Sequence, residues 1–349
     1  MQTSSLGAVR HPEKKEGSTT LLATGAVHSF GALTAIVVDW NLPDQTIRCV
    51  RALLADGVPA NRVVIVENGP TEPNWERTST ELSGCVLVRV ERNVGFAAAN
   101  NLGARILPGH AYLLVNNDAF VHGSGVAARM LAALAREDIG IVVPRLLNPD
   151  HTLQPSVAPF TVPHVALIRA SGLSRFVPNR WQPRSSTHWD HASSREIEAA
   201  IGAVMLVDGR VWGQLGGLRE SAFMYAEDLD LCWRARRTGW KTWFEADAEF
   251  IHLGGASSDR RWSTRERAEK VASAEAAMIR AHLPGVGAAT TLLLMRLGLE
   301  VRVVCFTLLG KKDAAESCRG SLAGLRTAAA EPARTTQPPP AWEVIRPPG

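Results

Sequence analysis

The chain has 349 residues, of which 46% are hydrophobic, so it can bury one large α/β core with a smaller appended part. Its net charge of +4 allows an acidic partner such as a diphosphate or an anionic membrane, and gives no reason to expect nucleic acid. Its five cysteines are scattered without a C-x-x-C pair, which favours the reduced thiols of a cytosolic protein over a disulfide framework or a metal site.

The N-terminal region contains an apolar run, residues 21–38, that follows two lysines and so has the outline of a signal peptide. His28 interrupts the run, and its last residues form the first predicted strand, so cleavage behind it would remove part of the fold. We therefore expect no secretion and a cytoplasmic protein that begins with a poorly ordered extension, residues 1–31.

The first half of the chain alternates predicted strands and helices. Residues 34–41 (TAIVVDWN) and 62–70 (RVVIVENGP) are β-branched apolar runs that stop in polar residues, which predicts two buried strands. Residues 45–56, between them, place apolar side chains at helical spacing. Strand, helix and strand predict a parallel βαβ unit, and hence an α/β fold with a mostly parallel central sheet and flanking helices.

A glycine turn follows in residues 91–107 (ERNVGFAAANNLGARIL), which predict a turn running into a helix of small residues. Asn93, Gly95 and Phe96 form the turn, and Asn100 offers a side-chain amide close behind it. Gly95 would let the backbone approach a diphosphate or a ribose closely, so we expect a ligand at this turn.

The next predicted strand, residues 112–121 (YLLVNNDAFV), is apolar and then changes to Asn116, Asn117 and Asp118. Ligands of open α/β sheets collect at the carboxyl ends of the strands. The three polar residues are therefore candidate ligand contacts.

A short amphipathic helix is predicted to begin at residues 227–228 and to end before Gly239, because Leu229, Cys232 and Trp233 fall at i, i+3 and i+4 and form an inward stripe. Asp228 stands where the helix begins, and there the helix dipole and free backbone N–H groups favour an ionised carboxylate. Such a group can accept a proton at neutral pH, so Asp228 is a candidate general base. The alternative is an ordinary acidic N-cap.

An apolar run, residues 288–312, lies near the C-terminus and contains Arg296, Glu300 and Arg302. Each charge near a bilayer centre costs about 2.5 to 3.5 kcal/mol, so a simple spanning helix is not expected. Two interpretations stay open. The segment lies on a membrane surface with the lysines at 311–312 toward lipid phosphates, or it packs on the protein's own core or on a second subunit.

These observations divide the chain into four parts. The extension 1–31 precedes the main domain, residues 32–284. Residues 285–334 form a helical segment that contacts the membrane in the first interpretation. Residues 335–349 are rich in proline, which predicts a disordered tail.

Four motifs together resemble the family 2 inverting glycosyltransferases of the GT-A fold, and most closely their bacterial rhamnosyltransferase-like branch. In chain order they are RNVGFAAANNLG, LLVNNDA, EDLDLCWRARRTGW and HLGGAS. A lone NND or ED would mean little, whereas four motifs in the family's order are specific. The resemblance covers residues 34–282, and it implies a GT-A-type nucleotide-diphospho-sugar transferase fold.

The resemblance also implies roles for individual residues. Asp228 matches the catalytic base. Asp118 matches the last acid of the metal motif and would hold a divalent cation, Mg²⁺ or Mn²⁺, with His252 beside it; the alternative for His252 is a hydrogen bond to a backbone carbonyl. The expected donor-binding residues are Asp39, Asn41, Glu67, Asn68, Asn93, Gly95, Phe96, Asn100 and Asn117. On the acceptor side the expected residues are Gly202, Glu227 and Trp212.

The sequence departs from the family pattern in two places. Glu67 and Asn68 stand where the family more often has Asp-Asn or Asp-Asp, which leaves the nucleotide preference open. The metal motif reads Asn-Asn-Asp, so Asp118 is its only carboxylate. This composition predicts a weakly held cation that the phosphates of the donor complete, as is common for Mg²⁺.

Glycosyl transfer needs both a cation-binding residue and a general base, because charge builds on the diphosphate leaving group while the acceptor hydroxyl loses a proton. A single displacement with one base inverts the anomeric centre. We therefore expect an inverting glycosyltransferase that uses a nucleotide-sugar donor, with dTDP-L-rhamnose as the leading candidate, and a glycan or lipid-linked glycan acceptor. The expected location is the cytoplasm, with peripheral contact at the cytoplasmic face of the membrane.

Three alternatives are weighed against this expectation. The donor could be a UDP-hexose or UDP-galactofuranose. The chain could instead be a catalytically inactive glycan-binding protein, but Asp118, Asp228 and His252 together argue against it. An NAD-dependent oxidoreductase is disfavoured because no GxGxxG follows the first strand.

Overall fold

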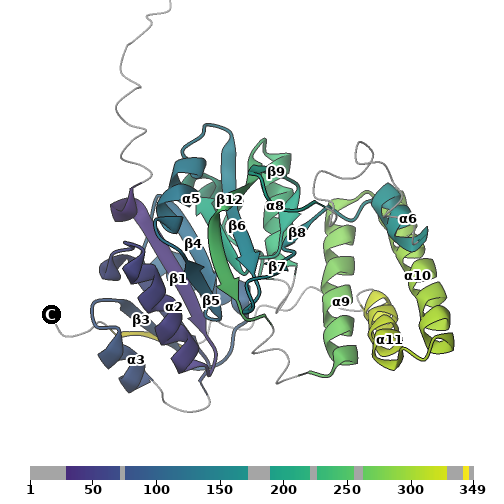
Figure 1. The fold of residues 1–349 in the computed structure, drawn as a ribbon, viewed down its shortest axis with the longest axis horizontal. Coiled ribbons are helices and arrows are strands. Elements are labelled where there is room, and N and C mark those ends of the chain that lie inside the picture. The colour runs from purple at the N-terminus through teal and green to yellow at the C-terminus, as the bar shows by residue number, and fades with distance from the viewer. Residues whose placement is uncertain are drawn as a thin grey trace, which may run out of the picture.

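A central sheet carries helices on both faces, and a second group of helices stands at one end of the molecule (Figure 1). The computed structural model describes residues 29–70, 75–171, 189–220, 226–254, 262–327 and 341–345. Most of the predicted N-terminal extension, residues 1–28, lies outside this part of the chain.

The sheet combines a parallel half with a mixed half. Its strands, in spatial order, are β13 (Trp342–Ile345), β3 (Val86–Val90), β2 (Val63–Asn68), β1 (Leu33–Asp39), β4 (Ala111–Asn116), β11 (Val204–Asp208), β6 (Ile139–Leu147), β12 (Lys241–His252) and β5 (Ala119–His122). Strands β3, β2, β1 and β4 are parallel, as predicted, and β6 is parallel to β12. Because β11 is antiparallel to both β4 and β6, those two strands point the same way, and the carboxyl ends of both parallel groups meet at one edge.

Four short strands lie beside this path. Strand β7 (Leu153–Gln154) pairs with β6, β9 (Arg195–Ile197) pairs with β12, and β8 (Val157–Ala158) pairs with β10 (Ala199–Ala200).

Two apolar layers form the core, one on each face of the sheet. The flanking helices are α2 (Pro43–Ala55), α3 (Trp75–Glu81), α4 (Phe96–Ile106), α5 (Val126–Leu134), α7 (Gly209–Leu215) and α8 (Glu227–Arg237), with short 3₁₀ turns at Phe30–Ala32 and Ala60–Arg62. Along β1, Leu33, Ala35 and Val37 pack with α2 and α5, whereas Ile36 and Val38 pack with α4 and the helices beside it. This alternation follows from the two-residue period of a strand.

A separate helical unit consists of α6 (Pro163–Ser171), α9 (Thr264–His282), α10 (Gly285–Leu308) and α11 (Lys312–Thr327). Helix α9 starts at a capping box between Ser263 and Glu266, and it shares the cluster of Ala272, Ala276 and Leu325 with α10 and α11. Helix α9, which the sequence analysis places in the main domain, thus packs with the C-terminal helices. Among the described residues, no helix combines the length and the apolar composition needed to cross a membrane.

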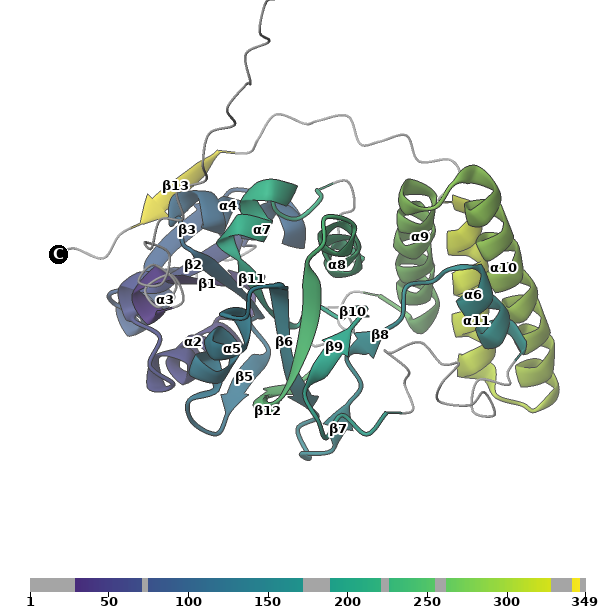
Figure 2. The ribbon, with the colours of Figure 1, turned by 90° about the horizontal axis from the view of Figure 1, so that it is seen from above.

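The predicted disordered tail, residues 335–349, contains a strand. Its residues Trp342–Ile345 form β13, which pairs antiparallel with β3, Trp342 opposite Val90 (Figure 2). The prediction was wrong for these residues because proline content was weighed over the β-forming residues of the WEVI segment. The outer strand of a sheet offers unpaired N–H and C=O groups, and β13 hydrogen bonds to those of β3.

Candidate active site

Polar residues from distant parts of the sequence meet at the carboxyl-end edge of the sheet. Asp39 ends β1, Asn68 ends β2 and Asn116 ends β4. The Asn116 N–H donates to the carbonyl of Ala203, 2.8 Å away, which brings the start of β11 to the same edge. His252 ends β12 and stands opposite Ala119. The fold therefore brings most of the predicted site residues together.

Asp39 is buried and fixed by three donors. Its Oδ1 accepts from the Thr46 hydroxyl at 2.8 Å, from the Asn117 amide at 3.0 Å and from the Leu42 N–H at 3.1 Å. Burial raises the pKa of Asp39, and these hydrogen bonds oppose the increase. Next to it, Asn41 adopts a left-handed backbone with φ of 57°. Thr46 was not among the predicted residues, because a threonine inside a helix gives no sequence signal.

Glu67 is buried beside a cation. Its Oε2 lies 3.2 Å from Nε of Arg89, on the neighbouring strand. Burial raises the pKa of Glu67, while Arg89 lowers it and Asp39 raises it further. The carboxyl thus stands at the end of β2 next to Asp39, as the resemblance implies for the nucleotide side.

The glycine turn is held by the side chains of two asparagines. The amide of Asn68 donates to Asn93 Oδ1 at 3.2 Å, and Asn93 Oδ1 also accepts from the Gly95 N–H at 3.0 Å. Gly95 has φ of 93°, which side chains disfavour, and Phe96 begins α4 behind it. Asn68 and Asn93 therefore shape the turn at the end of the sheet.

Asn100 lies fully buried on α4. Its amide donates to the carbonyl of Phe96 at 2.9 Å, and its Oδ1 has no hydrogen-bond partner in the part of the chain that the structure describes. A buried amide oxygen without a donor can accept a hydrogen bond from a ligand or a water.

Asp118 and His252 face each other at 3.3 Å, between Oδ1 and Nε2. The second ring nitrogen, Nδ1, lies 2.7 Å from Oε1 of Gln154. Gln154 is held in that orientation because its amide donates to Asn148 Oδ1 and to the carbonyl of His252. Oε1 of Gln154 can only accept, so Nδ1 donates the proton of this hydrogen bond, and the other ring nitrogen, Nε2, faces a carboxylate oxygen of Asp118.

This pair fits part of a cation site. A carboxylate oxygen and an imidazole nitrogen are both ligand types that bind divalent cations, and a histidine whose other nitrogen is fixed by a side chain is typical of metal ligands. No group of three or more His, Cys, Asp or Glu side chains suited to a metal ion occurs within the described ranges. Phosphate oxygens of a bound donor would have to supply further ligands, as expected from the Asn-Asn-Asp motif.

Asp228 is held by backbone N–H groups. Its Oδ2 accepts from Gly202 at 2.6 Å and its Oδ1 accepts from Leu229 at 2.7 Å. The N-cap of α8 is Ala226, with φ of 67°, so Asp228 is the second residue of the helix and not its N-cap. Burial raises the pKa of Asp228, and the two backbone donors oppose this.

Gly202 has a steric reason to be glycine. A Cβ at this position would stand 2.8 Å from Cβ of Asp228, closer than such atoms approach in proteins. The absence of a side chain lets the Gly202 N–H reach the carboxylate. Gly202 directly precedes Ala203, which is bonded to Asn116, so Asp228 lies at the same edge as Asp118.

Glu227 is buried at the first position of α8. Its Oε2 has no hydrogen-bond partner among the described residues, and burial, followed by the neighbouring Asp228, raises the pKa of Glu227 to about 8. The two adjacent carboxyls of the ED motif thus have different environments, since Asp228 receives backbone donors from Gly202 and Leu229, whereas the one backbone donor of Glu227 belongs to Glu227 itself.

Asp230 anchors α8 to α9. It lies 2.7 Å from His282 Nε2, 2.6 Å from Arg234 Nε and 3.1 Å from Arg219 Nη1. Burial raises the pKa of Asp230, but these three partners outweigh it and leave the pKa below its ordinary value. The spacing of Asp230 and Arg234 indicates their pairing, whereas nothing in the sequence indicates the other two partners.

Trp212 is placed away from this edge. It lies on α7, and its ring packs on Tyr112 with a centroid distance of 5.0 Å. Tyr112 stands near the start of β4, at the opposite end of that strand from Asn116. The structure therefore does not bring Trp212 together with Gly202 and Glu227.

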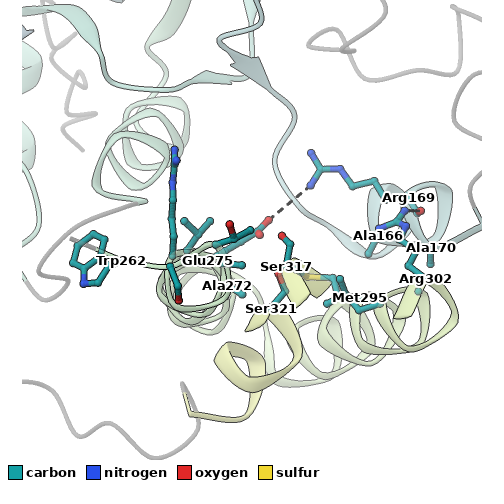
Figure 3. A pocket seen from close by; sticks show the side chains of 17 residues that line it. Ala166, Arg169, Ala170, Trp262, Ala272, Glu275, Met295, Arg302, Ser317 and Ser321 are labelled. Atoms are coloured by element: carbon teal, nitrogen blue, oxygen red, sulfur yellow. Dashed lines mark hydrogen bonds and ion pairs between the residues drawn. The ribbon is translucent and has the colours of Figure 1, made fainter. Parts of the chain in front are cut away.

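A cavity of about 720 Å³ lies in the helical unit, between α6, α9, α10 and α11. Figure 3 shows Arg169 reaching from α6 toward Glu275 on α9, with Met295 and Ser317 from the other two helices. None of the predicted site residues lines this cavity. The candidate active site and the cavity are thus separate features.

The fold is that of the GT-A glycosyltransferases. A mannosyltransferase from Pyrobaculum calidifontis, solved with GDP-Man and Mn²⁺, superposes with a TM-score of 0.52 at 14% identity, covering 86% of each chain. The structure of GalNAc-T7 with UDP, GalNAc and Mn²⁺ superposes with a TM-score of 0.51 at 12% identity, covering 71% of this chain and 47% of that one.

Residues 31–280 match the family model described as Glycosyltransferase like family 2, and the chain belongs to this family. An N-acetylglucosaminyl-diphospho-decaprenol L-rhamnosyltransferase of Mycobacterium tuberculosis (strain CDC 1551 / Oshkosh) is 27% identical over 215 residues, 57% of this chain and 68% of the relative. A low-salt glycan biosynthesis hexosyltransferase, Agl10 of Haloferax volcanii, is 29% identical over 150 residues, 42% of this chain and 44% of the relative. The predictions of fold, family and glycosyltransferase activity are confirmed.

Proposed function

We propose that the chain is an inverting glycosyltransferase that moves a sugar from a nucleotide-sugar donor to a hydroxyl group of a glycan or lipid-linked glycan, with Asp228 as the general base. The position of Asp228 supports this proposal most. It is fixed by the N–H groups of Gly202 and Leu229. Through Gly202 it lies at the sheet edge where Asp118 and His252 meet.

As the base, Asp228 takes the proton of the acceptor hydroxyl as its oxygen attacks the anomeric carbon, and the bond to the diphosphate breaks on the opposite face. The backbone donors keep the carboxylate oriented, while burial raises its pKa. A higher pKa makes the carboxylate a stronger base, provided that it stays ionised. Activity should therefore fall on the acid side, with a midpoint above the ordinary aspartate value of about 3.9.

On the donor side, Asp39, Glu67 and the Gly95 turn would contact the nucleotide and ribose. Asp118 and His252 would hold a divalent cation, with Mg²⁺ and Mn²⁺ both suited to a carboxylate ligand. When bound, that cation would neutralise charge on the diphosphate leaving group. The fixed Gln154 amide keeps the His252 ring oriented for this role.

L-rhamnose from dTDP-L-rhamnose is our leading donor. The 27% identity to a mycobacterial L-rhamnosyltransferase supports this choice, and the acceptor in that relative's name supports a lipid-linked acceptor here. The hexosyltransferase relative supports a UDP-hexose as the second candidate. We place the reaction in the cytoplasm, which agrees with the free thiols at Cys49, Cys85 and Cys232.

The test of the base is Asp228→Asn. The amide keeps the size of the carboxyl group but cannot take a proton, so transfer should fall by about 10² to 10⁴-fold. Donor affinity, measured by calorimetry, should change little. Asp190→Asn, an exposed aspartate of the described chain, is the matched control. Near wild-type transfer by the Asp228 variant would show that the carboxylate has a structural role only.

The test of the donor is a panel of nucleotide sugars, each with Mg²⁺, with Mn²⁺ or with excess chelator. A true donor stabilises the folded protein by mass action, so its melting temperature should rise with ligand concentration. We expect the largest rise for dTDP-L-rhamnose with a divalent cation. A larger rise for a UDP-hexose would replace the rhamnose assignment, and full transfer in chelator would remove the cation from the proposal.

A further inference from the structure

Helix α10 exposes a row of large apolar side chains along one face. Its members are Val286, Leu293, Leu297, Val301, Val304 and Leu308, with exposed fractions of 84, 55, 48, 59, 59 and 82%. Spacings of seven, four, four, three and four residues keep them on the same side of the helix. At 1.5 Å per residue, this outer α10 row is about 33 Å long.

The opposite face of α10 already holds the helix to the protein. Ala288, Thr291 and Gly298 are buried there, and a Cβ on Gly298 would stand 2.7 Å from Cα of Ala170 in α6. Leu292 and its neighbours on that face pack against the cluster of α9 and α11. The outer α10 row therefore contributes little to folding, because its side chains remain in contact with solvent.

An exposed apolar row of this length indicates an interaction surface. The row lies at the end of the molecule farthest from β13, on the helix that borders the helical unit (Figures 1 and 2). The protein's own sheet therefore does not cover the row.

The charges around α10 favour an anionic occupant. From residue 285 to 327 the cations are Arg296, Arg302, Lys311, Lys312, Arg319 and Arg326, and the acids are Glu300, Asp313 and Glu316. Lys311 and Lys312 are exposed and follow directly after the last turn of the helix. Cations beside an apolar row are the composition of helices that lie on anionic bilayers.

A second copy of the chain fits this surface less well. A stable protein interface uses about 20 to 30 residues on each side, with aromatic side chains and arginines as its strongest contacts. The outer α10 row has six large side chains, and all of them are aliphatic. A bilayer surface requires no shape complementarity, so a single helical row can bind it.

We propose that the outer α10 row lies on the surface of an anionic bilayer, with the helix axis parallel to the membrane plane. The six aliphatic side chains enter the boundary between headgroups and acyl chains, and Lys311 and Lys312 contact lipid phosphates. The inner face stays packed on α6, α9 and α11. This contact is independent of the proposed reaction, because it uses none of the residues of the candidate active site.

The test is co-sedimentation of the full chain with vesicles of phosphatidylcholine, with and without phosphatidylglycerol. We expect binding to the anionic vesicles. Leu293→Gln combined with Leu297→Gln should weaken it at least about tenfold, because two of the six aliphatic side chains would then be too polar to enter the acyl-chain boundary. Val271→Gln, an exposed aliphatic residue on α9, is the matched control and should bind like the parent.

Lys311→Gln combined with Lys312→Gln should lower binding to anionic vesicles by up to about thirtyfold, because each lysine near such a surface contributes about 1 kcal/mol. High salt should remove the same part of the affinity. Melting temperatures and donor binding of all variants report whether fold and active site remain intact. The proposal is overturned if the parent binds no vesicle, or if light scattering shows a dimer that only the leucine variant dissociates.

Discussion

The sheet edge and the helical unit are stabilised in different ways. At the sheet edge, carboxyls such as the buried Asp39 and the half-buried Asp228 are fixed by hydrogen bonds from segments far apart in the sequence. In the helical unit, small residues such as Ala272 and Ala276 pack helix on helix, and pairs such as Arg296 with Glu300 remain exposed.

The difference follows from what each region must do. Buried, oriented carboxyls cost free energy, and such groups are typical of sites where proton transfer or ligand binding takes place. The helical unit is held together by small and apolar side chains packed between its helices, and the described residues leave the outer α10 row uncovered. Substitutions at the edge should therefore change chemistry, and those in the helical unit should change stability or binding to surfaces.

The largest effect is expected where the sheet domain meets the helical unit, at Asp230, because this residue connects α8 of the sheet domain to His282 of α9. Asp230→Ala removes the carboxylate partner of Arg234 and His282, whose side chains are nearly buried, and should lower the free energy of unfolding by about 3 kcal/mol or more. Urea denaturation followed by circular dichroism measures this loss. Asp138→Ala removes an exposed pair with Lys241 and should change the free energy of unfolding far less. Equal losses would show that the two regions are not joined through Asp230.

A second test concerns Gln154, which orients His252 at the carboxyl-end edge of the sheet. Gln154→Leu should raise the Mg²⁺ or Mn²⁺ concentration needed for half-maximal transfer by about 10 to 100-fold, because His252 loses the acceptor that orients its ring. Titration of each cation at fixed donor concentration provides the measurement. Gln214→Leu, whose amide bonds Trp240 at the surface, serves as the control. An unchanged cation requirement would contradict the assigned role of His252.

A third test measures how much free energy of unfolding the burial of the Glu227 carboxyl at the sheet edge costs. Its folded pKa of about 8 exceeds the ordinary 4.5, so folding favours the protonated form, and stability should decline as pH rises from about 4.5 to about 8. Glu227→Gln lacks this decline and should be more stable than the parent by an amount on the order of 1 kcal/mol above pH 8. Melting temperatures of the parent and of the Glu227→Gln variant, measured across this pH range, test this prediction. Parallel pH profiles for the two proteins would mean that Glu227 is ionised at little cost.

The smallest effect is expected in the helical unit. Arg296→Ala removes a pair with Glu300 in which both side chains are about half exposed, so the free energy of unfolding should change by less than about 0.5 kcal/mol. Thermal unfolding at low and high salt measures the change. A loss above 1 kcal/mol would mean that surface charge stabilises α10 more than the packing of its inner face suggests.

Sequence reasoning found the sheet edge because its signals are local. Asp39, Glu67 and Asp118 each follow a β-branched apolar run, and Asp228 starts a helix with a clear inward stripe. Parallel strands then place such residues at one edge without further information. The roles of these residues in catalysis remain predictions.

Contacts between residues far apart in the sequence could not be predicted. Gln154 binds His252, 98 residues away, and lies where the sequence shows no periodicity. Trp212 is a large aromatic residue near a glycine, and nothing local distinguishes packing on Tyr112 from stacking on a sugar.

The two faces of α10 could not be separated by periodicity, because apolar residues occur all around the helix. The sequence left two interpretations, a membrane surface helix or a helix packed on protein. The structure packs one face on α6, α9 and α11 and exposes the other, so the second interpretation holds for the inner face.

Strand β13 has a practical consequence for handling the protein. It covers the outer edge of β3, so a truncation that removes the C-terminal helices also removes this cover. An uncovered, apolar edge strand is a template for pairing between molecules, which leads to aggregation. Shortened versions of the chain that end before Trp342 should therefore be less soluble, and an affinity tag belongs at the other end of the chain.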